Sequence, residues 1–228
     1  MADSHWMKTP STPTVVFDLD HTLIRCDSFA GFSQYMLWRR WWRLALALIV
    51  SPVVAALWTT RYTRLYAVST LVWCGTLGMD EQALFRRMDR YVAKRFEDPS
   101  SVVCQGALRE LRRHQSEGAR VLVATGSVAP LAERVCQQIG IVGVEVVGST
   151  LRRLHGGWVA DKHCFGRRKV SMLRAYGLSQ WDVVYTDSAA DLPLLTHGIR
   201  RFVVNPTPKE RKKISDLLGA DLEVVEWL

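Results

Sequence analysis

The segment from residue 28 to residue 79 contains no aspartate and no glutamate. A cationic stretch without acids cannot pair its charges internally, so we expect it to face an anionic partner. The same segment holds five of the nine tryptophans in the chain. Its arginines and tryptophans are Arg39, Arg40, Arg43, Arg61, Arg64, Trp38, Trp41, Trp42, Trp58 and Trp73.

Cysteine patterns and targeting signals are also missing. The chain has five cysteines but no Cys-x-x-Cys pair, which predicts neither a disulfide framework nor a zinc site and favours a reducing compartment. Residues 1–13 are polar and lack the apolar core of a signal peptide. We therefore expect the cytoplasmic face of the inner (plasma) membrane, with the cytoplasm as the alternative.

No apolar run reaches the length that a bilayer requires. The runs at 44–58 and 65–79 are shorter than the ~20 residues of a spanning helix, and Pro52 should kink or break the first one. Three interpretations remain open: a buried cap of a soluble enzyme, a spanning helix, or a helical hairpin in the membrane interface. Tryptophan and arginine at both ends of the first run favour the hairpin.

The overall composition fits one core domain with one small insert. The chain has 228 residues, is 48% hydrophobic and carries a net charge of +8. This charge is typical of a protein that binds phosphate, lipid headgroups or nucleic acid, although a basic soluble protein is the simpler alternative.

Two carboxylates follow a predicted buried strand at 14–17. Asp18 and Asp20 lie at its carboxyl end, which is where ligands bind in open α/β sheets. Two carboxylates this close hold one proton more tightly than the other, which suits a nucleophile beside a general acid. The alternative is a solvated turn in which Asp20 caps the next helix.

Further polar groups follow later predicted elements. The strand at 120–125 ends in hydroxyls, Lys169 begins an amphipathic helix, and the strand at 182–185 precedes two acids four residues apart. Pro99 is expected to begin a helix with Val103, Leu108 and Leu111 as its core stripe. Strands alternating with helices predict an α/β fold with a doubly wound parallel sheet.

These motifs, in this order, resemble the haloacid dehalogenase superfamily of phosphohydrolases. The spacings Cys-x-Gly-x-x-Lys, ending at Lys169, and Asp-Ser-x-x-Asp, from Asp187 to Asp191, are similar to the branch that contains phosphoserine phosphatase. Gly-Gly-Trp-Val at 156–159 and the apolar, arginine-flanked insert most closely resemble the phosphatidylglycerophosphatase C family.

The resemblance implies a division of the chain and a set of chemical roles. Residues 1–27 and 98–228 would form a Rossmann-like core, and 28–97 a helical, apolar cap inserted after the first motif. Asp18 would attack phosphorus and form an aspartyl phosphate. Asp20 would protonate the leaving alkoxide and then activate water. Lys169, favoured over Lys162, would neutralise the transferred group.

The resemblance also implies a phosphate site and a magnesium site. Thr125, Gly126 and Ser127 would hold phosphate oxygens, whereas Asp27 would either face the substrate or cap the next helix. Mg²⁺ would be held by four aspartates. Asp20 would contribute its backbone carbonyl, and Asp191 would orient the other ligands. These metal-site residues are Asp18, Asp20, Asp187 and Asp191.

The expected function is a magnesium-dependent phosphomonoesterase that converts phosphatidylglycerophosphate into phosphatidylglycerol. Its expected partners are a phosphorylated lipid and an anionic membrane surface, and no nucleic acid. One alternative is a soluble phosphatase for phosphoserine or a similar metabolite. Another is a catalytically silent membrane-binding protein, against which the complete set of motif residues argues.

Overall fold

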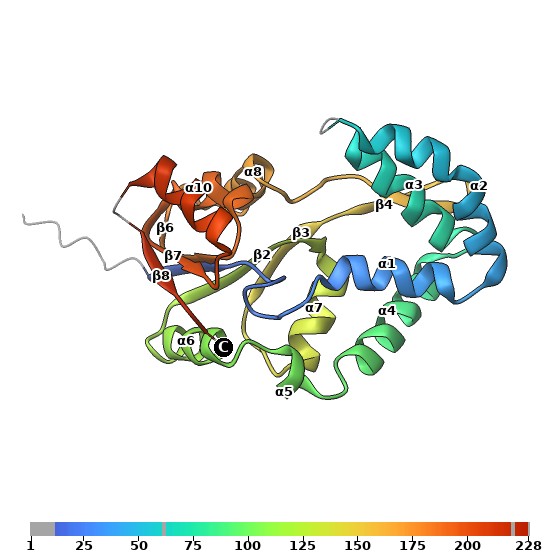
Figure 1. Cartoon of the computed structure of the whole chain (residues 1–228). Coiled ribbons are helices and arrows are strands. Elements are labelled where there is room, and N and C mark those ends of the chain that lie inside the picture. The colour runs from blue at the N-terminus through green and yellow to red at the C-terminus, as the bar shows by residue number, and fades with distance from the viewer. Residues whose placement is uncertain (1–11, 61–62, 220–221, 228) are drawn as a thin grey trace, which may run out of the picture.

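The core of the protein is a six-stranded parallel sheet (Figure 1). The computed structural model describes residues 12–60, 63–219 and 222–227. The strand order is β3-β2-β1-β6-β7-β8. The strands are β1 (Thr14–Phe17), β2 (Arg120–Val128), β3 (Glu145–Ser149), β6 (Trp181–Thr186), β7 (Gly198–Val204) and β8 (Glu223–Val225). This order confirms the predicted doubly wound α/β fold.

Helices follow the strands and fill the segment after β1. They are α1 (Ser28–Trp38), α2 (Trp41–Trp58), α3 (Arg64–Thr76), α4 (Glu81–Arg95), α5 (Pro99–Val102), α6 (Gln105–Ser116), α7 (Ala129–Gln138), α8 (Arg167–Ala175), α9 (Leu192–Leu195) and α10 (Pro208–Leu218), with a short 3₁₀ turn η1 (Ala189–Asp191) before α9. An antiparallel hairpin, β4 (Leu151–Leu154) and β5 (Gly157–Ala160), forms a separate two-stranded sheet.

Side chains alternate between two hydrophobic cores on the two faces of the sheet, as the two-residue period of a strand requires. Val15 and Phe17 join the core covered by α1, α4, α6 and α7. Val16 and Val184 join the core covered by α8, α9 and α10. The central strands are therefore buried on both faces, which explains their continuous apolar sequences.

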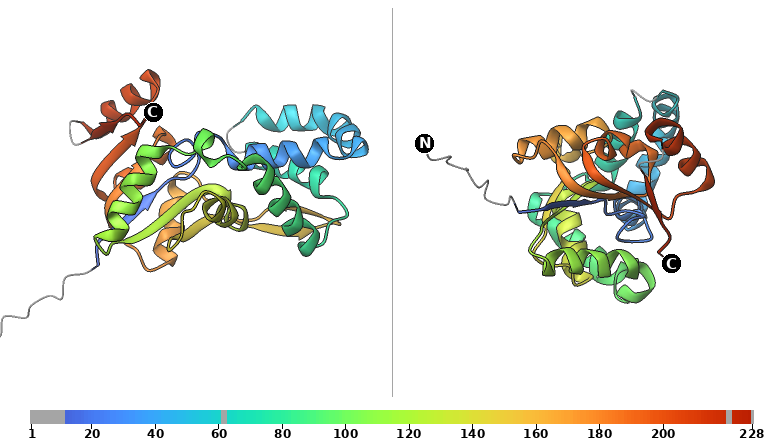
Figure 2. Two further views of the ribbon diagram at one scale, coloured as in Figure 1. Left: turned by 90° about the horizontal axis from the view of Figure 1, so that it is seen from below. Right: turned by 90° about the vertical axis from the view of Figure 1, so that its left-hand side faces the viewer.

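The first four helices form the insert, and they lie at the end of the molecule opposite α10 (Figure 2). The β4–β5 hairpin reaches out to this insert. The Trp73 indole donates to Leu154 O at 3.0 Å, and the Trp158 indole donates to Met79 O at 3.1 Å. The hairpin therefore packs on the insert. The predicted division of the chain into core and insert assigns the hairpin residues to the core, and this division stays a prediction.

Pro52 does not break α2, which was one of its two predicted effects; the other, a kink, stays a prediction. A proline here cannot donate a backbone hydrogen bond to Leu48 O, four residues earlier. The Ser51 hydroxyl donates to that carbonyl instead, at 2.8 Å. The helix therefore continues from residue 41 to residue 58.

The helix predicted from Pro99 is in fact two helices, so that prediction was wrong. α5 ends at Val102, and α6 begins at Gln105. Between them, Val103 forms a β-bridge with Ile24, and Cys104 N donates to Leu23 O at 2.9 Å. Pairing with a distant segment has overridden the local helical pattern.

Candidate active site

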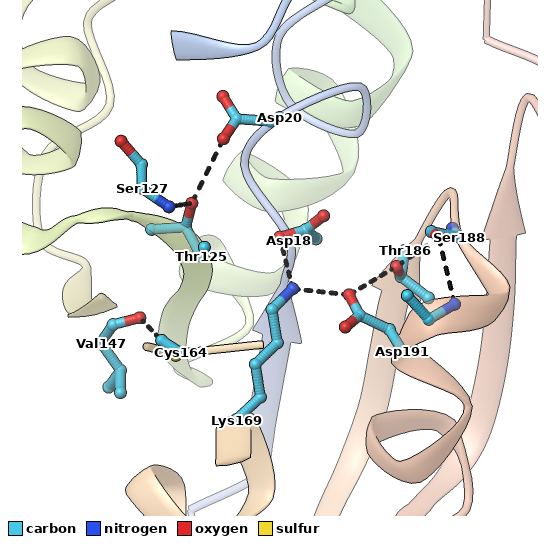
Figure 3. A network of polar contacts seen from close by, with 12 residues as sticks. Asp18, Asp20, Thr125, Ser127, Val147, Cys164, Lys169, Thr186, Ser188 and Asp191 are labelled. Atoms are coloured by element: carbon cyan, nitrogen blue, oxygen red, sulfur yellow. Dashed lines mark hydrogen bonds and ion pairs between the residues drawn. The ribbon is translucent and has the colours of Figure 1, made fainter. Parts of the chain in front are cut away.

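Lys169 lies between two carboxylates at the carboxyl edge of the sheet (Figure 3). Its Nζ donates to Asp18 Oδ1 at 2.7 Å and to Asp191 Oδ2 at 2.5 Å. All three side chains are buried. The residues come from the end of β1, the first turn of α8 and η1, so only the folded chain brings them together.

The chain around these residues fixes their positions. Asp18 N donates to Tyr185 O at 2.9 Å, which extends the pairing of β1 with β6 by one residue. The Thr186 hydroxyl donates to Asp191 Oδ2 at 3.0 Å. The other oxygen of this carboxylate, Oδ1, is buried and has no hydrogen-bond partner among the described residues.

The charges of this group are unevenly balanced. Burial alone would lower the pKa of the Lys169 ammonium, but Asp18 and Asp191 outweigh it and raise that pKa above its ordinary value. Burial raises the pKa values of Asp18 and Asp187, an effect that Lys169 opposes in both. Burial thus disfavours the charged forms of both carboxyl groups, and the Lys169 ammonium offsets part of that effect.

Asp20 lies in a second hydrogen-bonded cluster. Its Oδ1 accepts from Ser28 N at 2.7 Å, and its Oδ2 accepts from the Thr125 hydroxyl at 3.5 Å. Ser127 N donates to Thr125 Oγ1 at 3.0 Å. Burial raises the pKa of Asp20 to about 6, against the opposing bonds from Ser28. A carboxyl with this pKa can both give and take a proton near neutral pH.

The structure distinguishes between alternatives for two other residues. Asp27 Oδ1 accepts from Ala30 N at 2.7 Å, so this carboxylate caps α1. Asp27 also lines the cavity described next, and a contact with substrate stays a prediction. Lys162 is exposed and does not line that cavity, whereas Lys169 does.

A cavity of about 620 Å³ opens above these residues. Its floor includes Asp18, Asp20, Asp187, Gly126 and Ser127. The part of its lining that comes from the insert is mostly apolar, with Ser33 and Gln34 as its polar side chains. The residues of this apolar wall are Phe29, Leu37, Trp58, Leu65, Val68 and Leu71.

The donor set fits a hard divalent cation in its chemistry. Asp18, Asp20, Asp187 and Asp191 all line the cavity, and they outnumber the single lysine there. Within the described part of the chain, no group of three or more His, Cys, Asp or Glu side chains is arranged to hold a metal ion. Mg²⁺ commonly uses only one or two carboxylates and takes its other oxygens from phosphate and water.

Residues 15–196 match the family model described as haloacid dehalogenase-like hydrolase. This match covers most of the chain, and the protein belongs to this family. It is accordingly a hydrolase, built on the family's α/β core.

Solved structures share the fold over nearly the whole chain. A Bordetella pertussis Tohama I protein of unknown function superposes with a TM-score of 0.69 at 20% identity, covering 96% of this chain and 100% of that one. A phosphoserine phosphohydrolase-like protein from Francisella tularensis gives 0.60 at 12% identity, covering 93% and 94%. A substrate-bound phosphoserine phosphatase gives 0.54 at 12% identity, covering 89% and 90%.

The sequence patterns did not predict several residues that shape the site. Ser28 holds Asp20, and its hydroxyl also donates to Ser127 Oγ at 3.0 Å. Thr186 holds Asp191. Ser149 Oγ donates to Gly126 O at 2.7 Å. The position of Thr186 at the end of a motif strand was the one available signal, because the other contacts join segments far apart in the chain.

Proposed function

We propose that the protein is a phosphomonoesterase that forms an aspartyl phosphate on Asp18 and acts on a lipid phosphate at a membrane surface. The particular reaction we propose is the conversion of phosphatidylglycerophosphate into phosphatidylglycerol. The observation that carries this proposal is the cavity, which joins a polar, carboxylate-lined floor to an apolar wall.

The first half of the reaction forms the intermediate. A carboxylate oxygen of Asp18 attacks phosphorus, and the bond from phosphorus to the ester oxygen breaks. Asp20 donates its proton to the departing alkoxide oxygen. Lys169, already 2.7 Å from Asp18 Oδ1, offsets negative charge on the transferred group.

The second half restores the enzyme. Asp20, now ionised, takes a proton from a water molecule, whose oxygen attacks the phosphorus. The acyl phosphate bond breaks, inorganic phosphate leaves, and Asp18 is free again. The hydrogen bond from Ser28 N orients Asp20 in both steps.

Mg²⁺, when bound, would supply positive charge that lets an anionic nucleophile approach a dianionic phosphate. Asp18, Asp187 and the Asp20 carbonyl would hold it, and Asp191 would orient this group. The excess of carboxylates over cations around the cavity supports this assignment.

The apolar wall supports a lipid substrate over an amino acid. A substrate such as phosphoserine carries an ammonium and a carboxylate that need charged partners away from the phosphate. Lys169 is the one lysine or arginine among the described lining residues, and two aspartates already bind it. A glycerolipid instead presents apolar surface that such a wall can bury.

The outer surface of α2 supports a membrane location. By length and composition, α2 is the one helix among the described residues that could cross a bilayer, although it packs along α3. Only Arg43 and Ala47 of α2 are buried. Its exposed apolar residues outside the catalytic cavity, which we call the α2 face, are Trp41, Leu48, Ile49 and Val53.

We infer that the α2 face lies in the interface of an anionic membrane, on the cytoplasmic side of the inner membrane. Arg39, Arg40 and Arg64 are exposed around it, and no acid occurs in that segment. Arg61 was predicted to contribute, but it lies outside the described residues. Arg43 was also expected there, but it is 5% exposed.

A soluble phosphatase for a small metabolite is the second candidate. The structural likeness to phosphoserine phosphatases favours it, and the catalytic floor serves both substrates equally. The two candidates differ only in what fills the apolar half of the cavity.

A phosphate-release assay with Mg²⁺ in mixed micelles separates the candidates. The substrates are phosphatidylglycerophosphate, phosphatidic acid and phosphoserine, and Asp18→Asn is the matched inactive control. We expect release from the lipid phosphates, with phosphatidylglycerophosphate the best substrate. Preferential turnover of phosphoserine would reject the lipid assignment while leaving phosphatase chemistry intact.

A further inference from the structure

Arg43 is a buried cation without an anionic partner. Its side chain is 5% exposed, and one hydrogen bond holds it, from Nη2 to Leu77 O at 3.0 Å. Its Nε and Nη1 atoms are buried and have no partner among the described residues. An unpaired buried guanidinium is costly, so its retention requires an explanation.

Other arginines surround Arg43 instead of acids. Burial lowers its pKa, and the neighbouring charges of Arg87 and Arg40 lower it further. Arg87, on α4, also has a buried Nη1 atom without a partner in the described part of the chain. The ion pairs found among the described residues use other arginines: Arg113, Arg120, Arg134 and Arg200.

The start of α2 adds to the positive field at this point. Arg43 lies in the first turn of this helix, where backbone N–H groups attract anions. Arg40 occupies the N-cap position, and no side chain caps the helix. The Arg43 guanidinium lies over the Trp42 ring, 4.9 Å from its centroid.

We propose that Arg40, Arg43 and Arg87 form a binding site for a tetrahedral phosphate oxyanion, separate from the catalytic cavity. None of these three residues lines that cavity. The ligand would accept hydrogen bonds from the guanidinium atoms that now have no partner. Arg40 is exposed and Arg87 half-buried, so side-chain movement of these two opens the way to Arg43.

The ligand has two possible sources with the same chemistry. Trp38 and Trp41, exposed by 68% and 81%, lie beside Arg40 in the sequence. A phosphodiester headgroup could therefore reach the site from a membrane on which these tryptophans rest. Free inorganic phosphate could reach it from solution.

The first test is the thermal stability of the full-length protein in rising inorganic phosphate, with ionic strength held constant by chloride. Arg43→Met and Arg87→Met are compared with Arg39→Met, which removes one exposed charge from the same region. None of the three substitutions changes a residue that lines the catalytic cavity, so any stabilisation by phosphate bound there should be the same in all variants. We expect a clearly smaller phosphate-dependent rise in Tm in both site variants than in the control, which should keep the wild-type rise.

The second test is binding to phosphatidylglycerol–phosphatidylcholine vesicles. Binding of both site variants roughly tenfold weaker than that of Arg39→Met, about the loss of one charge-assisted hydrogen bond, would identify a lipid headgroup as the ligand. Loss of the phosphate effect in solution, with vesicle binding equal to the control, would identify free phosphate.

The site would be refuted if both variants matched Arg39→Met in both tests. Arg43 would then serve only to brace Leu77 O at the end of α3. Arg87 makes no such contact, so Arg87→Met remains informative even where Arg43→Met fails to fold.

Discussion

At the scale of single residues, Asp20 is the group that transfers protons in the proposed reaction. Its pKa, raised to about 6 by burial, and its hydrogen bond from Ser28 fit a group that protonates a leaving alkoxide. Asp20→Asn should lower turnover of an alkyl phosphate by about 10²–10⁴-fold, the usual contribution of general acid catalysis.

The control for this prediction is a leaving group that needs no proton. With p-nitrophenyl phosphate as substrate, the Asp20→Asn variant should form the aspartyl phosphate at close to the wild-type rate. The burst of p-nitrophenolate in rapid-mixing experiments measures this rate. If Asp20→Asn lowered the rate of this step equally for both substrates, Asp20 would shape the site without transferring a proton.

At the residue scale, some contacts of the site could be predicted from the sequence and others could not. The resemblance to the haloacid dehalogenase superfamily predicted that Asp18, Lys169 and Asp191 act together, and the structure places them in hydrogen-bond contact. Arg43 was misplaced, because composition shows that a segment is cationic but not which of its side chains turns inward.

At the scale of secondary-structure elements, α2 is the part that decides between membrane and solution. Leu48 and Ile49 are 64% and 75% exposed on the α2 face. Replacing both with serine should weaken binding to anionic vesicles by roughly tenfold or more, because each apolar side chain contributes about 1.5–3 kcal/mol when fully buried.

The matched control is Leu217→Ser. Leu217 is 60% exposed on α10, at the other end of the molecule (Figure 1). Vesicle sedimentation measures the binding, and hydrolysis of a soluble phosphate ester should be unchanged in both proteins. Vesicle binding that survives the double replacement would place the membrane contact elsewhere.

Elements with strong periodic patterns were predictable, and those set by distant contacts were not. The motif strands β1, β2 and β6 lie where buried apolar runs were predicted. The strand β8 was missed, since its three residues have a partner only in β7. That α2 continues through Pro52 could not be predicted, because the effect of the neighbouring Ser51 hydroxyl depends on its rotamer.

At the scale of the whole molecule, one buried histidine links stability to pH. The His114 Nε2 atom lies 3.0 Å from the Tyr185 hydroxyl, where α6 packs on β6. Burial lowers the pKa of His114 below its ordinary value of 6.5, so the unfolded chain takes up a proton first as pH falls. This contribution to stability is present above pH 6.5 and is lost below it.

His114→Gln keeps a polar partner for Tyr185 and removes the titration. Urea unfolding between pH 8 and pH 5 should show a smaller loss of stability for this variant than for wild type. The control is His197→Gln, which lies between α9 and β7 and should follow the wild-type profile. Parallel profiles for wild type and His114→Gln would contradict the assignment.

The central claim is that Asp18 carries the phosphoryl group during turnover of a lipid phosphate. The most direct measurement is acid quenching of the protein during turnover of phosphatidylglycerophosphate radiolabelled in its terminal phosphate, followed by peptide sequencing. The proposed mechanism predicts a hydroxylamine-sensitive label on Asp18. Label on another residue, or undiminished turnover by Asp18→Asn, would contradict it.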